Sequence, residues 1–234
     1  MKFAILFAVI PYVAAATFVV GLIGRFLLLG KRWPAQPVWS RASQRRKPGH
    51  RALAGAVIIL VTLAHLAVLL APGAVLAWNA VAWRLYALEG AAFAVGLLAL
   101  VLGARALRRC FGNRAPSAAA EITDVVFLAL LLTGIVSGLG LAAFYRWGSS
   151  WAAVTLTPYV ASLTHARPQT EFLSEMPFLV QLHVFTAFAA LALFPFSSVA
   201  LAAMMATRRA LTPPGEQPQS GSRWRILGDR RRRA

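Results

Sequence analysis

Residues 52–71 read ALAGAVIILVTLAHLAVLLA and contain no charged side chain. About 20 apolar residues in a helix cross the ~30 Å hydrocarbon core of a bilayer. Because lipid offers the backbone no hydrogen-bond partner, such a segment crosses as an α-helix, whose backbone bonds are satisfied internally. The stretch therefore predicts a transmembrane helix, and it raises the question of why His65 lies inside it.

The rest of the chain has the same apolar character. Of its 234 residues, 59% are hydrophobic and only 13% are charged, which is far more apolar than a soluble domain of this size requires. Four further segments are long and apolar enough to span a bilayer, about 3–24, 85–104, 125–145 and 178–206. The alternating pattern of a membrane β-barrel is absent. We therefore expect an all-α membrane protein, a bundle of five transmembrane helices.

The first of these segments also resembles a signal peptide, because Lys2 precedes an apolar run that contains three consecutive alanines. The run continues to Gly24 and is followed by Arg25. That length suits a spanning helix better than the shorter apolar region of a signal peptide. We expect the segment to be retained.

The basic residues are unevenly distributed along the chain. It holds 24 Lys and Arg against 7 Asp and Glu, and residues 25–51, 105–114 and 207–234 contain eight, four and eight of the basic ones. With five spans, all three regions fall on one side of the membrane, which the positive-inside rule makes the cytoplasmic side. The expected topology is N-terminus outside and C-terminus cytoplasmic. Because topology accounts for most of the charge, we expect no nucleic-acid partner, whereas membrane lipid is a natural one.

The sequence thus divides into a five-helix domain, residues 1–206, and a basic tail, residues 207–234. The tail is rich in Pro, Gly, Ser and Gln before it becomes basic, which is typical of a flexible extension. Its arginines can act simply as a topology signal. Trp224 and Ile226 interrupt the arginines and leave open a role in docking a partner.

Two histidines lie inside predicted spans at matching depth. His65 is seven residues before Pro72, or ~10 Å from the outer end of its helix, and His183 is six residues after Pro177, or ~9 Å from the same surface. The two helices are antiparallel, so the imidazoles lie at one level of the membrane. Ionisable groups inside a membrane are costly and usually have a function and a partner.

The residues alone leave two interpretations of these histidines open. Each ring can be a structural group that bonds a nearby hydroxyl, such as that of Thr62 or Thr186. Alternatively, two neutral imidazoles can bind one haem iron from opposite sides. A zinc site needs three or four ligands, and we expect no carboxylate or thiol at this depth. At the outer surface, Arg84, Arg146 and Arg167 are candidates for binding haem propionates or a quinone, or are ordinary interfacial arginines in an aromatic belt.

Three motifs resemble the gamma, or cytochrome b, subunit of membrane-bound respiratory nitrate reductase. They are IPYVAAATFVVGLIGRF in the first segment, HLAVLLAP in the second and LHVFTAFAALALFPFSS in the fifth. The resemblance implies a multi-pass protein of a bacterial-type cytoplasmic (inner) membrane that oxidises quinol near the outer face. It also implies electron transfer through haem b to iron–sulfur and molybdenum-type oxidoreductase subunits. His65 and His183 match the family's axial ligands of the haem nearer the outer face.

The chain also departs from this family. Gly55 and Leu201 stand where the family carries the ligands of a second, inner haem, so the resemblance implies a variant with one haem b. His50 with Met204 or Met205 is a poor substitute, because counting along the helices does not place them in one plane. The family's early lysine of the third helix falls at Leu85, beside Arg84, which makes that arginine a quinone candidate.

Two other functions are considered. A haemless membrane anchor or assembly subunit of such a complex explains the missing inner ligands, although it leaves the outer histidines without a purpose. A small transporter is disfavoured because the spans show neither an ionisable relay nor a repeat. The partner enzyme, its substrate and the direction of electron flow are not specified by the sequence.

Overall fold

The computed structural model describes residues 2–28, 48–111, 119–201 and 203–204. All regular structure in these ranges is helical, which confirms the predicted all-α class. The predicted tail, residues 207–234, lies outside the described residues. Met1–Ser198 forms one compact unit.

The five long helices are α1 (Lys2–Leu28), α3 (Pro48–Leu70), α5 (Ala82–Phe111), α6 (Ala119–Phe144) and α10 (Phe178–Leu193). Each contributes a stretch that is apolar and long enough to cross a membrane: Ile5–Leu27, Ala52–Leu70, Ala82–Arg108, Ile122–Phe144 and Phe178–Phe196. The predicted five-span bundle is therefore confirmed. Many large apolar side chains on these helices are exposed, as expected where lipid replaces water.

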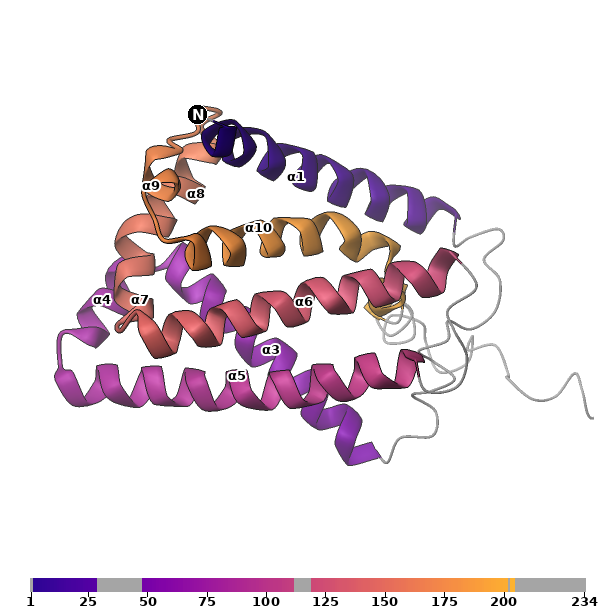
Figure 1. Ribbon diagram of the computed structural model, residues 1–234, viewed down its shortest axis with the longest axis horizontal. Helices are drawn as coiled ribbons and strands as arrows, with labels where there is room; N and C mark the ends of the chain where they lie inside the picture. Colours follow the sequence, from indigo (N-terminus) through magenta and orange to yellow (C-terminus); the bar gives the residue numbers. More distant parts are fainter. Residues whose placement is uncertain (1, 29–47, 112–118, 202, 205–234) are drawn as a thin grey trace, which may run out of the picture. The chain divides into compact units, whose positions relative to one another are not determined.

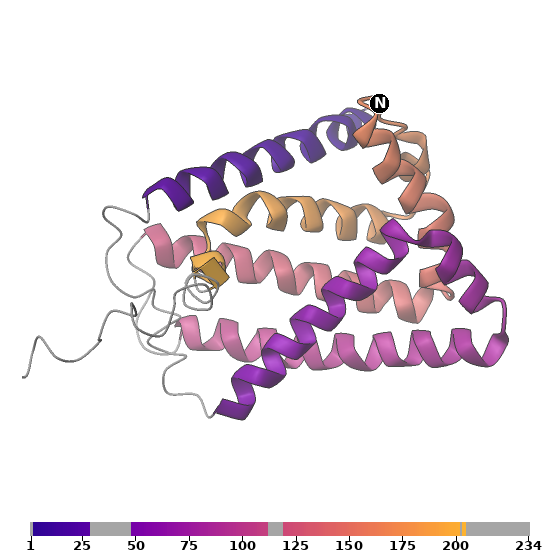
Figure 2. The same cartoon turned by 180° about the vertical axis from the view of Figure 1, so that it is seen from behind.

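Four of the long helices lie side by side in one layer, in the order α1, α10, α6 and α5 (Figure 1). The fifth, α3, crosses this layer diagonally on one face, as Figure 2 shows from behind. Its closest neighbours are α5 and short helices at one end of the bundle. Only 6% of the spanning window of α3 is buried, so this helix is far less embedded than α10.

Short helices gather at the end of the bundle where α3 and α6 end and α10 begins (Figure 1). They are α4 (Pro72–Asn79), α7 (Gly148–Trp151), the π-helix η1 (Ala152–Leu156), α8 (Thr157–Thr164) and α9 (Glu171–Ser174). We call residues 148–164, comprising α7, η1 and α8, the cap segment, and this end of the bundle the cap end.

A cluster of buried side chains holds the cap segment in place. Tyr159 of α8 is completely buried, and its hydroxyl donates a 2.7 Å hydrogen bond to the carbonyl of Phe7 in α1. The buried core residues are Phe7, Leu141, Tyr159, Leu173, Val180 and Val184. The cap segment is therefore fastened to α1, α6 and α10.

At the opposite end, the fifth span does not continue as one helix through the predicted segment 178–206. Phe194–Phe196 forms a 3₁₀ turn, η2, because Pro195 has no N–H and cannot continue the α-helical ladder. The buried side chain of Arg25 donates to the carbonyls of Pro195 and Ser197, the latter at 2.7 Å. The Ser198 N–H donates to Asp124 of α6 at 2.7 Å. The GLIGRF end of the first motif thus contacts the FPFS signature of the third.

Candidate functional site

The structure brings His65 and His183 together. Each lies five residues from the cap end of its helix, His65 before Leu70 and His183 after Phe178. Their ring centroids are 6.1 Å apart, and the ring planes differ by 21°. The equal depth predicted by counting residues is therefore accompanied by direct apposition of the two rings.

Both rings present the same nitrogen to a backbone carbonyl. Nδ1 of His65 is 2.8 Å from the Val61 oxygen, and Nδ1 of His183 is 2.9 Å from the Gly134 oxygen. A carbonyl oxygen only accepts hydrogen bonds, so these contacts assign the ring proton to Nδ1 in both residues. Nε2 then carries no proton and has a free lone pair, which is the state that a metal ion requires of its ligand.

The separation of the rings fits an ion bound between them. A metal–imidazole bond is about 2 Å long and the ring centroid lies roughly 1 Å behind the nitrogen, so two such ligands on opposite sides of one ion have centroids about 6 Å apart. Among the described residues, no group of three or more His, Cys, Asp or Glu can hold a metal. An ion here would have only two protein ligands, and a porphyrin supplies the remaining positions in a bis-histidine haem.

The two imidazoles have different surroundings. His65 is exposed on α3, and its Nδ1 bonds a carbonyl of its own helix. His183 is partly buried against α6, where the Ser137 hydroxyl lies 3.1 Å from Nδ1 and also donates to the Gly134 carbonyl at 2.9 Å. Ser137 is only 1% exposed, so it is committed to this contact. Its role was not predicted from the sequence, because it depends on the rotation of α6 about its axis.

Gly138 provides the room for the His183 ring. A Cβ atom at this position would lie 3.0 Å from Cε1 and 3.3 Å from Nδ1 of His183. Gly134 and Gly138 lie four residues apart, a spacing of small residues whose ordinary use in membrane helices is close packing. In the structure, Gly138 lies directly against the imidazole of His183.

The hydroxyls considered as structural partners do not bond the rings. Thr186 Oγ1 donates to the backbone carbonyl of His183 at 2.9 Å, and not to its ring. The His65 ring bonds the Val61 carbonyl and not Thr62. The two threonines are therefore not the partners of the rings, but a hydroxyl, that of Ser137, does lie beside His183 Nδ1, and the structural interpretation stays open.

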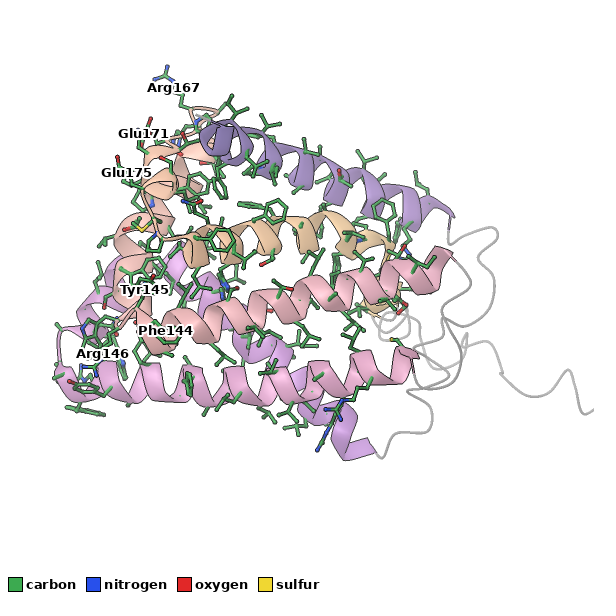
Figure 3. The ribbon with its side chains drawn as sticks, viewed as in Figure 1. Phe144, Tyr145, Arg146, Arg167, Glu171 and Glu175 are labelled. Carbon is green, nitrogen blue, oxygen red and sulfur yellow. The ribbon has the colours of Figure 1, made fainter. Side chains whose placement is uncertain are left out.

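The three candidate arginines all lie at the cap end, on separate elements. Arg84 of α5 packs its guanidinium carbon 5.1 Å from the Trp78 ring and 5.7 Å from the Trp83 ring. Arg146 follows α6 beside Tyr145, whereas Arg167 lies some way off, on the same side as α9 (Figure 3). The structure does not bring them together, and their assignment to propionates or a quinone stays a prediction.

A polar cluster at the cap end was not predicted. Glu89 of α5 accepts hydrogen bonds from the backbone N–H and hydroxyl of Ser149 at 2.9 and 2.7 Å. The buried Asn79 donates to the hydroxyls of Ser149 and Ser150, both at 2.9 Å. Glu89 lies seven residues into α5 and meets Ser149, which follows the end of α6, whereas His183 meets Gly138 within α6. Glu89 bonds the cap segment instead of forming a metal site with the histidines.

Fold and site together define a multi-pass helical membrane protein with paired imidazoles on two antiparallel spans. The chain belongs to the nitrate reductase gamma subunit family, whose family model matches residues 3–208. The match includes all five spans and confirms the resemblance found in the three motifs. A comparison with curated proteins finds no match.

Proposed function

We propose that the chain is the membrane-anchoring cytochrome b subunit of a nitrate-reductase-type complex, in which His65 and His183 are the axial ligands of one haem b. The subunit then exchanges electrons between the quinone pool and partner subunits of the iron–sulfur and molybdenum type. When bound, haem b supplies reversible one-electron chemistry at its iron. The protein's contribution is to hold both imidazoles at one depth, in one tautomer and at a fixed separation.

The observation that carries this proposal is the pairing of the two imidazoles. The 6.1 Å between their ring centroids is close to the spacing of two imidazoles that bind one ion from opposite sides, and both Nδ1 atoms bond backbone carbonyls. A neutral imidazole whose Nδ1–H bonds a carbonyl keeps Nε2 unprotonated, so both rings of the pair are in the state that can bind an iron. Membership of the gamma subunit family supports the same assignment.

A single haem is supported by the residues at the positions of the family's inner ligands. Gly55 lies on α3, ten residues before His65, and has no side chain, while Leu201 has no metal-binding atom. A Cβ atom at Gly55 would meet nothing within 4 Å. These residues support one redox site, at the cap end.

The charge distribution supports the orientation of that site. If the regions rich in arginine are cytoplasmic, the N-terminus and the cap end face outwards in a bacterial-type cytoplasmic membrane. The histidine pair then lies near the outer face, where quinol from the bilayer would be oxidised. Arg84, Arg146 and Arg167 lie at the same end and are the proposed contacts for propionates or quinone.

An absorption spectrum of the chain purified with its lipid tests the proposal. We expect a dithionite-reduced haem b band that is lost in His65→Ala and in His183→Ala. His165→Ala is a matched control, because the His165 Nδ1 also bonds the carbonyl four residues earlier, Ala161, at 2.8 Å. That histidine lies in the exposed loop after α8 and has no facing imidazole among the described residues.

Loss of the band in both site variants, with His165→Ala unchanged, would support axial ligation by the pair. A wild-type chain without bound haem, or a band that survives His65→Ala, would refute it. In the former case, the haemless anchor remains as the function of the subunit.

A further inference from the structure

The position of His65 is not fixed by packing around it. Every residue from 62 to 67 of α3 is exposed, and the helix as a whole is the bundle's diagonal outer member (Figure 2). His183, by contrast, sits on α10 between α1 and α6. A site that depends on the separation of two rings therefore needs another device to hold the outer part of α3.

One hydrogen bond from the cap segment holds this part of α3. In an α-helix, the carbonyl of Val68 would accept from the N–H of residue 72, but that residue is Pro72 and has none. The Thr157 hydroxyl donates to the Val68 oxygen at 3.0 Å instead. In the described part of the chain, this is the one side-chain hydrogen bond between residues 52–70 of α3 and another element. Val68 lies one helical turn beyond His65.

Thr157 is itself held by an unusual piece of backbone. It closes the π-helix η1, where its N–H bonds the carbonyl of Ala152, and it precedes Pro158. The wider turn accommodates a proline whose ring would otherwise meet the carbonyl four residues earlier. Two residues later, Tyr159 is completely buried and bonded to α1. The hydroxyl of Thr157 is thus presented to α3 from a rigid support.

We propose that Thr157 is a positioning residue for His65, supplying the hydrogen bond that Pro72 cannot make and so fixing the outer end of α3 relative to α10. Its effect on a haem rests on the function proposed above. Its effect on the position of α3 does not, and the two can be measured separately.

The position of α3 is measured on the full chain in lipid nanodiscs without haem. In a Cys110→Ser background, spin labels are attached to the exposed positions Leu60→Cys on α3 and Leu191→Cys on α10. Pulsed electron paramagnetic resonance then gives the distance between them. We expect Thr157→Val to broaden the distribution or to shift its mean by roughly 2 Å, the size of ordinary helix shifts. Thr157→Ser, which keeps the hydroxyl, should retain the original distribution.

Thr164→Val is the matched control, because the Thr164 hydroxyl bonds only within the cap segment, to the Ala161 carbonyl at 2.7 Å, and to the adjacent His165 ring. It should leave the distance unchanged. Equal distributions for the original chain and Thr157→Val would overturn the proposal. The same would follow if Thr164→Val changed the distribution as much as Thr157→Val did.

The effect on a haem is measured on the chain loaded with haem, through the midpoint potential and the low-spin electron paramagnetic resonance signal. Thr157→Val should shift both, and Thr157→Ser should restore them. If the chain binds no haem but the label distance still responds to Thr157→Val, the positioning role stands and the electron-transfer function fails. If haem is bound and neither the distance nor the signal responds, the positioning role fails while the electron-transfer function stands.

Discussion

We expect Gly138→Ala to disturb the histidine site while leaving the stability of the helix bundle nearly unchanged. The added Cβ atom would lie 3.0 Å from Cε1 of His183, whereas ordinary contacts begin at 3.4 Å, so the ring must move by about 0.4 Å. The ring cannot move freely, because its Nδ1 is bonded to the Gly134 carbonyl at 2.9 Å and lies 3.1 Å from the Ser137 hydroxyl. The displacement would lengthen these bonds or rotate the ring away from His65.

The stability terms for this variant nearly cancel. Alanine is more favourable than glycine within a helix by about 1 kcal/mol. A weakened hydrogen bond costs about 1 kcal/mol. We therefore expect an unfolding temperature close to that of the original chain, together with a large loss of haem b or an altered spectrum.

The assay is thermal unfolding in detergent alongside the reduced-minus-oxidised spectrum. Gly90→Ala is the control, because a Cβ atom at that position of α5 meets nothing within 4 Å. It should leave the spectrum unchanged. A Gly138→Ala variant with the original spectrum and haem content would refute the argument that this glycine makes room for the imidazole.

Two further predictions concern the ends of the bundle. Tyr159→Phe removes the buried 2.7 Å bond to the Phe7 carbonyl and should lower the free energy of unfolding by about 1–2 kcal/mol, with little change in haem content. Burial raises the pKa of Tyr159, so folding favours the protonated phenol. The contribution of Tyr159 to the free energy of unfolding is therefore complete below a pH of about 10 and falls as the pH rises further. Unfolding of the original chain at several alkaline pH values checks this. Arg25→Met removes the donor to the Pro195 and Ser197 carbonyls and should destabilise the bundle by about 2–4 kcal/mol, measured by thermal unfolding. Arg25→Lys, which keeps a charged donor, should recover part of the loss, and an unaffected Met variant would contradict this role.

The sequence was sufficient for those features that depend on counting along one helix. The five spans follow from apolar length, and the depth of His65 and His183 follows from their distances to Pro72 and Pro177. The contacts of Ser137 and Thr157 could not be predicted, because they depend on how α6 rotates and on where the cap segment meets α3. The break at Pro195 was visible in principle, since proline lacks the N–H that an uninterrupted span requires.

The unequal embedding of the two histidine-bearing helices has a consequence for biogenesis. Helices α1 and α6 both pack against α10, whereas α3 attaches mainly through α5 and the short helices of the cap end. We expect the former three to assemble into a stable half-site that already presents His183. The lipid-facing α3 can then close laterally over a cofactor delivered from the bilayer, so that His65 completes the site as the last step of maturation.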